Sequence, residues 1–227
     1  MGEIFDFSPI FESFDRVWAG FQSTIQLSVA SAILSLVLGT ILVAMRVAPI
    51  PLLRAAGTIY VNAVRNTPLT LVLLFSSLAI SDTLHIVVSD VPRTNYYWFG
   101  VFGLSAYTAC FVCEVLRSGI NTVPLGQAEA ARSIGLTFAQ SLRIIILPQA
   151  FRTVIAPLGS VFIAMIKNTT VVIVASYAEA AAIMKDLFED YSASLGIFIG
   201  FAIGFMVLTL PTGYFFGWLA KRLAVAR

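Results

Sequence analysis

Five long runs of apolar residues constrain this chain more than any other feature of its sequence. A helix needs about 20 predominantly apolar residues to cross the roughly 30 Å hydrocarbon core of a bilayer. Most polar residues inside the runs are Ser, Thr and Asn, which can bond to the backbone or to neighbouring helices. The runs therefore predict five membrane-spanning helices, over Gln22–Met45, Ala55–Ile80, Tyr97–Gly119, Phe151–Ala175 and Leu195–Ala220.

The charged fraction supports this interpretation. Of the 227 residues, 59% are hydrophobic and only 11% are charged, whereas a typical soluble domain has about 25% charged residues. Too few charges are present to cover the outside of a soluble domain. The alternating segments of about 10 residues that are typical of transmembrane β-barrels are also absent. The sequence predicts an all-α integral membrane protein.

The placement of the charges predicts the orientation of the bundle. Basic residues concentrate between spans one and two, between spans three and four, and after span five, while the N-terminus and the other two connections are acidic. Because basic residues mark the cytoplasmic side, the N-terminus is expected outside and the C-terminus in the cytoplasm. Residues 1–21 then form an extracytoplasmic segment without the features of a signal peptide, 22–222 the membrane domain, and 223–227 a cytoplasmic tail.

The two cysteines and the single histidine do not indicate a redox site or a metal site. Cys110 and Cys113 form a C-x-x-C pair, which in a cytosolic α/β protein would suggest a redox site. Here both lie inside the third span, where we expect them to be small packing residues. His85 stands in a short polar loop with no metal-binding partner nearby in the sequence. We expect neither a catalytic residue nor a metal site.

The third connection, 120–150, is too long and too patterned to be a simple linker. Alanines favour a short helix over Gln127–Ile134, and Gly135 is a natural residue to end it. Thr137 and Gln140 have the spacing of a capping box that starts a second helix. That helix is expected to reach Leu147, with Pro148 close behind.

The same connection carries a family resemblance. Glu129-Ala130-Ala131, Gly135 and Ile146-Leu147-Pro148 are similar to the EAA motif of ABC importer permeases. Other segments resemble the polar amino acid permeases of that superfamily, with the glutamate-uptake permeases as the nearest group. These segments are Arg65–Leu69, Ala106-Tyr107, Glu114 with Arg117, Val123–Gln127, Pro148–Arg152 and Lys167–Thr170.

The resemblance implies a type I ABC importer in a bacterial inner membrane. Its short cytoplasmic helix would dock onto a dimer of separate ATPase subunits, and Glu129 would pair with a partner cation or cap the helix. The alternative is an interfacial helix without a partner. The other implied partners are a second permease chain (homologous or identical), an extracytoplasmic substrate-binding protein and membrane lipid, with no nucleic acid. The expected coupling residues are Gly126, Glu129, Ala130, Ala131, Gly135, Leu147 and Pro148.

The chain itself lacks the phosphate-binding loop that ATP hydrolysis requires. That loop places a lysine directly after a glycine, and none of Lys167, Lys185 and Lys221 follows a glycine. We therefore expect no cofactor on this chain, with ATP and Mg on the partner ATPase. The chain is predicted to be a transport subunit and not an enzyme.

Two polar interruptions of the spans are candidates for the substrate path. Charges inside the membrane are costly and by default mark function or face the bundle interior. Pro68 also removes a backbone hydrogen bond and kinks the second span. The alternatives are an arginine that reaches the interface, a lysine in a helix–helix contact, and an intrahelical pair of Glu114 with Arg117. The path candidates are Arg65, Asn66, Thr67, Pro68, Lys167, Asn168, Thr169 and Thr170.

The predicted function is that of a permease subunit of an ATP-driven importer for a polar amino acid, with glutamate as the nearest choice. The alternative is a secondary transporter or channel that is not coupled to ATP. Such a protein would show paired broken helices in two repeated halves, and five spans do not divide equally. A purely structural membrane scaffold would leave the patterned third connection unexplained.

Overall fold

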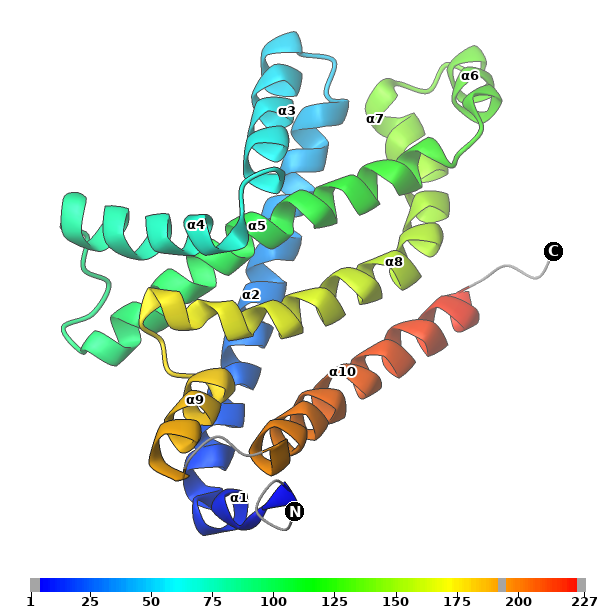
Figure 1. Ribbon diagram of the computed structural model, residues 1–227. Coiled ribbons are helices and arrows are strands. Elements are labelled where there is room, and N and C mark those ends of the chain that lie inside the picture. Colours follow the sequence, from blue (N-terminus) through cyan, green and yellow to red (C-terminus); the bar gives the residue numbers. More distant parts are fainter. Residues whose placement is uncertain (1–4, 192–194, 224–227) are drawn as a thin grey trace.

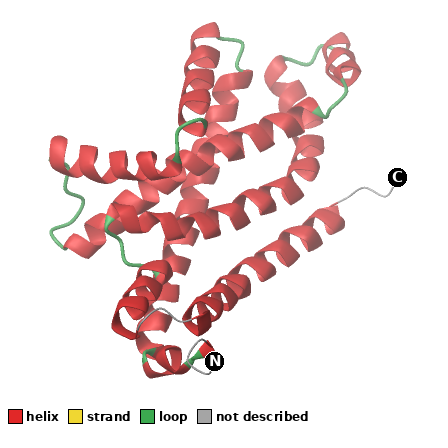
Figure 2. Cartoon of the chain, viewed as in Figure 1, coloured by secondary structure: helices red, strands yellow, loops and turns green. Residues whose placement is uncertain are grey.

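The computed structural model describes residues 5–191 and 195–223, and every regular element within them is a helix (Figure 2). The expected all-α fold is confirmed. The first four residues and residues 224–227 of the expected tail lie outside the described part. Within these described residues, four stretches are long and apolar enough to cross a membrane: α2 (Phe14–Val47), α5 (Pro92–Asn121), Phe138–Ala175 and α10 (Leu195–Leu223).

The fifth candidate span is broken near its middle. Helix α3 (Pro51–Arg65) and helix α4 (Leu69–Leu74) meet at an angle of 109°, and α4 continues as a π-helical segment, η2 (Phe75–Thr83). Pro68 has an extended ψ of 136° and precedes the first residue of α4. Its ring fixes φ and its nitrogen offers no donor, so the kink expected at Pro68 is confirmed as a complete break between two helices.

The third connection folds largely as its residue pattern predicts. Helix α6 (Leu125–Ser133) ends before Gly135, whose φ is +88°. Leu136 N donates to Ala131 O at 3.1 Å, and Gly135 N donates to Arg132 O at 3.0 Å. These two bonds close a helix end with the glycine in the left-handed conformation. The predicted stop at Gly135 is confirmed.

The second helix of this connection does not stop at Leu147, and that prediction is wrong. The capping box of Thr137 and Gln140 is present and starts α7 (Phe138–Ser141). The helix then runs on through η3 (Leu142–Ile146), α8 (Leu147–Asn168) and the 3-10 segment η4 (Thr169–Ala175). Pro148 lies inside this run, directly after the π-helical segment η3, so the helix that contains the fourth span begins well before Phe151.

Two short helices outside the spans define one end of the bundle. Helix α1 (Ser8–Glu12) precedes α2, and α9 (Ala180–Tyr191) lies in the fourth connection, where no helix was expected. Both lie at the bottom of Figure 1, whereas α6 and α7 lie at its upper right. We call these the N-terminal end and the loop end.

Small residues let α2 and α5 pack closely at the centre of the bundle. Ser31 and Ser35 are fully buried. A Cβ atom at Gly39 would lie 2.6 Å from Val112 Cγ1, which leaves no room for any side chain. Cys110 and Cys113 are free and buried within the same layer, so their expected role in packing is confirmed. By contrast, α10 packs mainly along α8 and keeps a large apolar surface exposed, including Val207 and Trp218.

Candidate functional site

Helix α6 presents an exposed surface of small residues with bulky apolar residues at its ends. Glu129 and Ala130 are exposed, while Leu125 and Ile134 are 81% and 78% exposed. Only Ala131 turns inward, with 4% exposure. Because exposed apolar patches on a protein usually mark an interaction site, this surface can receive a partner.

A hydrogen bond between two residues that adjoin the coupling candidates connects α6 to the fourth span. The Gln149 side-chain amide donates to the side-chain oxygen of Gln127 in α6 and, at 2.8 Å, to Ile145 O. Leu147 and Pro148, beside Gln149, are exposed at the start of α8. A displacement of α6 would therefore reach α8 directly.

Glu129 cannot cap the start of α6. It is the fifth residue of the helix, and the first turn contains no acidic residue. The capping alternative is therefore wrong. Within the described residues its carboxylate has no ion-pair partner, so the pairing with a cation on another chain stays a prediction.

A carboxylate shared by three arginines joins α2, α3 and α5. Glu114 Oε1 lies 2.6 Å from Arg46 Nη1 and 3.7 Å from Arg65 Nη1, and Oε2 lies 3.3 Å from Arg117 Nη2. The Arg46 side chain is only 9% exposed. The expected pair of Glu114 with Arg117 is confirmed, but it is one part of a cluster with a net charge of +2. Arg65, at the break between α3 and α4, belongs to this cluster.

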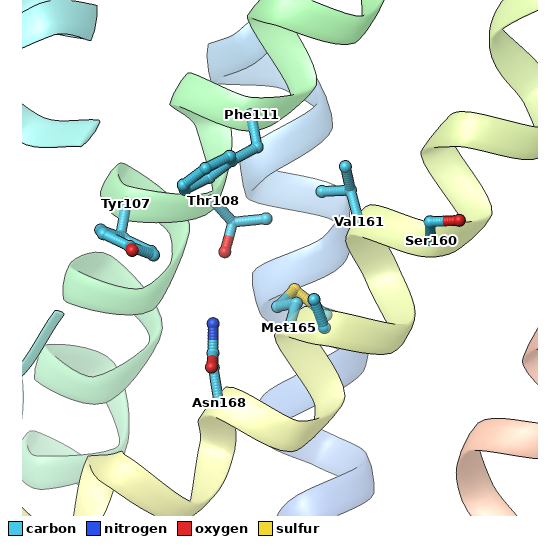
Figure 3. Close-up of a pocket in the computed structure, with 8 residues that line it drawn as sticks. Tyr107, Thr108, Phe111, Ser160, Val161, Met165 and Asn168 are labelled. Carbon is cyan, nitrogen blue, oxygen red and sulfur yellow. The ribbon is translucent and has the colours of Figure 1, made fainter. Parts of the chain in front are cut away.

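A cavity of about 260 Å³ lies between α5 and α8, in the middle of the bundle. Figure 3 shows Asn168 pointing toward Tyr107 and Thr108 across this space. Within the described residues, the Asn168 amide has no hydrogen-bond partner. The cavity thus contains a free amide close to two hydroxyl-bearing side chains. Its lining consists of Tyr107, Thr108, Phe111, Ser160, Val161, Ala164, Met165 and Asn168.

Lys167 does not reach that cavity. It lines a separate groove of about 370 Å³ between α8 and α10, together with Thr209 and Tyr214. Consecutive residues of a helix point about 100° apart, which places Lys167 and Asn168 on different faces of α8. Arg65 lines neither of these spaces and lies in the Glu114 cluster.

The other path candidates satisfy their polar groups within their own helices. Thr169 is fully buried, and its hydroxyl donates to Ile166 O at 2.8 Å. The Thr170 hydroxyl donates to Lys167 O at 2.8 Å. The Asn66 amide and the Thr67 hydroxyl likewise donate to backbone oxygens one turn earlier, at 2.7 and 2.9 Å. These bonds stabilise the ends of the broken helices.

A buried carboxylate at the N-terminal end was not expected. Glu179 has no exposed surface. It accepts hydrogen bonds from Thr24 Oγ1 at 3.0 Å and from the backbone nitrogens of Ala181 and Ala182 at 2.8 and 3.3 Å. Burial raises its pKa to about 7, although these donors oppose the shift. The carboxylate fastens the start of α9 to α2.

The chain is similar to known transport proteins over almost its whole length. Residues 35–225 match the family described as "Binding-protein-dependent transport system inner membrane component". The chain is 50% identical to the glutamate transport system permease protein GluC of Corynebacterium efficiens, over 91% of this chain and 93% of the relative. It is 32% identical to the probable glutamine ABC transporter permease protein GlnM of Bacillus subtilis, over 95% and 97%.

The fold is found in a solved amino acid ABC transporter. The structure described as an amino acid ABC transporter with histidines has a TM-score of 0.84 and 25% identity, and the match covers 96% of this chain and 98% of that one. A methionine ABC transporter in inward-facing conformations shares the fold, with a TM-score of 0.71 at 15% identity. The chain therefore belongs to the family of binding-protein-dependent inner membrane components, as a multi-pass permease subunit of an ABC importer and not an enzyme.

Proposed function

We propose that this subunit carries glutamate, or a closely related amino acid, across the inner membrane into the cytoplasm. The observation that carries the proposal is the 50% identity to a glutamate permease over nearly the full length of both chains. ATP, with Mg, is hydrolysed on a separate ATPase dimer. A second permease chain completes the path, and an extracytoplasmic binding protein delivers the substrate.

In this proposal the loop end faces the cytoplasm and α6 docks onto the ATPase. Two features support this: the exposed surface between Leu125 and Ile134, and the Gln127–Gln149 bond that connects α6 to α8. Closure of the ATPase dimer would push α6, and the continuous helix from Phe138 to Ala175 would carry the displacement into the membrane. A rigid helix with two positions is a sufficient device for such coupling.

The proposed substrate path runs along both faces of α8. An amino acid carboxylate that leaves water needs a compensating charge. Lys167 is exposed on the α10 side of α8, and Asn168 lines the cavity beside α5. We propose that the substrate meets two separate sites in succession: Lys167 offsets its charge in the groove beside α10, and the Asn168 amide and the Thr108 hydroxyl bond to its polar groups in the cavity beside α5.

Reconstitution of the complete transporter in liposomes tests this function. The permease chains, the ATPase and the binding protein are combined, and uptake of labelled glutamate is measured with ATP inside the vesicles, so that only transporters whose ATPase faces inward are energised. We expect ATP-dependent uptake of glutamate that an excess of unlabelled glutamate abolishes. Uptake without ATP would support the alternative of a secondary transporter or channel, and uptake of an unrelated solute alone would overturn the choice of substrate.

The orientation has its own test in whole cells. Single cysteines at Val88, Glu189 and Ser133, in a variant without Cys110 and Cys113, are exposed to a thiol reagent that does not cross membranes. We expect labelling at the first two positions and none at Ser133 until the cells are opened. Labelling of Ser133 from outside would reverse the proposed orientation.

A further inference from the structure

Two adjoining hollows lie at the N-terminal end, far from α6. One has a volume of about 400 Å³ and the other about 220 Å³, and Arg93 and Tyr177 line both. We call them together the Arg93 cavity. The larger volume falls within the range of small-molecule sites, about 300–1,000 Å³. The walls come from α2, the start of α5, the link 176–178 and α9.

Two consecutive residues of α2 fix the walls of this cavity. Arg93, on α5, donates to Ser23 Oγ at 3.1 Å. Thr24 donates to the buried Glu179 at 3.0 Å and accepts from Ala180 N at 3.1 Å. The link between η4 and α9 is thereby held against α2. The buried carboxylate of Glu179, otherwise without a role in transport, positions one wall.

The charges around the cavity leave one cation without a counter-ion. Arg16 lies 2.8 Å from Asp190 and 3.6 Å from Asp186, so two carboxylates neutralise it. Arg93 has no ion-pair partner among the described residues, and its one hydrogen bond, to Ser23, is to a neutral group. The cavity therefore contains an exposed guanidinium without a counter-ion.

Aromatic side chains with polar tips surround this guanidinium. Tyr97 and Tyr177 pack edge to face with ring centroids 5.5 Å apart, and the Tyr97 hydroxyl is 3.3 Å from Gln26 O, to which it donates. Tyr96 lines the larger hollow. Because a guanidinium binds a carboxylate through two parallel hydrogen bonds, the arrangement fits a small molecule with a carboxylate and a short apolar stem.

We propose that the Arg93 cavity binds the carboxylate of the transported amino acid on its way to the middle of the bundle. The proposal rests on the amino acid import proposed above and adds a second binding site, at the end of the bundle opposite the coupling helix. Arg93 is the counter-ion, Ser23 orients it, and Glu179 holds the facing wall. The site supplies a compensating charge where the substrate begins to leave water.

The test measures binding of labelled glutamate to the assembled permease–ATPase complex in nanodiscs of uncharged lipid, without the binding protein. We expect Arg93→Gln to weaken this binding at least tenfold. The matched control is Lys185→Gln, which removes a cation at the same end but outside the cavity and should bind as the wild type does. Affinity for the loaded binding protein, measured separately, should stay unchanged in both variants.

Three results would overturn the proposal. Wild-type glutamate binding by Arg93→Gln would remove the residue from the site. Loss of affinity for the binding protein with glutamate binding retained would make Arg93 a docking residue. An effect of the substitution that occurs only in nanodiscs with anionic lipid would assign the cation to a lipid headgroup. If Arg93→Gln fails to assemble, Arg93→Met, which keeps an unbranched stem without the charge, replaces it: weaker glutamate binding supports the site, and unchanged binding overturns it.

The same preparation separates this proposal from the function itself. A wild-type transporter that imports glutamate while Arg93→Gln binds normally contradicts only the site. A wild-type transporter that neither binds nor imports glutamate contradicts the proposed substrate, whatever Arg93 does.

Discussion

The two ends of the bundle use opposite arrangements of charge. At the loop end, one carboxylate, Glu114, lies among three arginines, and its closest partner Arg46 is 9% exposed. At the N-terminal end, one arginine, Arg16, lies between Asp186 and Asp190, and all three side chains are about half exposed. The first cluster joins three helices inside the bundle, and the second fastens α9 to the start of α2 at the surface.

The difference shows that the contribution of an ion pair to stability depends on how deeply the pair is buried. Water screens an exposed pair, which contributes about 0–1 kcal/mol. A buried pair is costly to form, and removal of one partner leaves a charge that costs about 3–5 kcal/mol. Loss of one ion-pair partner should therefore cost more stability at the loop end than at the N-terminal end. At the N-terminal end, Glu179 and apolar packing contribute more than the exposed ion pairs.

The largest effect is expected from Glu114→Gln. The substitution leaves Arg46, Arg65 and Arg117 without a carboxylate, and Arg46 is nearly buried. We expect a loss of about 3–5 kcal/mol, seen as low abundance in the membrane and a much lower melting temperature in detergent. Glu189→Gln, which removes an exposed pair with Lys185, is the matched control and should be neutral. Equal behaviour of the two variants would contradict the contrast between the ends.

The second prediction concerns the pH dependence at the N-terminal end. Burial raises the pKa of Glu179 from 4.5 to about 7. Because the folded protein holds this proton more tightly than the unfolded chain, the contribution of Glu179 to stability falls as the pH rises from about 4.5 to about 7, and is constant above. The fall is of the order of 3 kcal/mol.

Glu179→Gln isolates this contribution, since glutamine stays neutral. We expect the melting temperature of the wild type to fall relative to that of the variant as the pH rises through this window. Measurement of both proteins in the same detergent buffers cancels the effect of every other titrating group. Parallel curves would show that Glu179 is ionised throughout.

The third prediction tests the loop end through its backbone. Gly135 has φ +88°, and no atom lies within 4 Å of the place where its Cβ would be. A side chain there would strain the backbone but would not collide with a neighbour. Gly135→Val should cost about 1–3 kcal/mol and reduce uptake sharply while the protein still reaches the membrane. Gly135→Asn, which tolerates this conformation, and Gly217→Ala, at an open position of α10 without positive φ, should both transport normally. Normal uptake in Gly135→Val would show that coupling does not depend on this turn.

The smallest effect is expected from Arg16→Gln. Its pairs with Asp186 and Asp190 are exposed, so the loss of stability should be small and should shrink as salt is added. A melting curve at low and high ionic strength measures it. A loss as large as that of Glu114→Gln would abolish the distinction between the ends.

The features that could be predicted from the sequence depend on local patterns. Apolar runs identify the spans, Gly135 marks the end of α6, and Thr137 with Gln140 marks the start of α7. Each signal acts within a few residues, so no knowledge of the fold is needed. The broken second span follows in the same way from Pro68, although the angle of 109° depends on packing.

The features that could not be predicted depend on contacts between distant residues. Arg46 and Glu114 are 68 positions apart, and Thr24 and Glu179 are 155 apart. As an acidic residue in a polar connection, Glu179 was expected to contribute only to the charge of the outer side, because nothing near it in the sequence signals burial. Lys167 and Asn168 are neighbours in the chain, yet Lys167 faces α10 and Asn168 faces α5. Which face of α8 packs against which helix depends on the positions of α5 and α10, and the local sequence does not give these positions.

The closeness of α2 and α5 has a consequence for how the transporter can move. At Gly39 the Val112 side chain of α5 fills the space that a Cβ atom would need, so a sliding movement of the two helices would meet a steric obstacle. We therefore expect α2 and α5 to move together as one rigid unit during transport. We then expect access to the two sides of the membrane to change by movements outside this pair, such as at the break between α3 and α4.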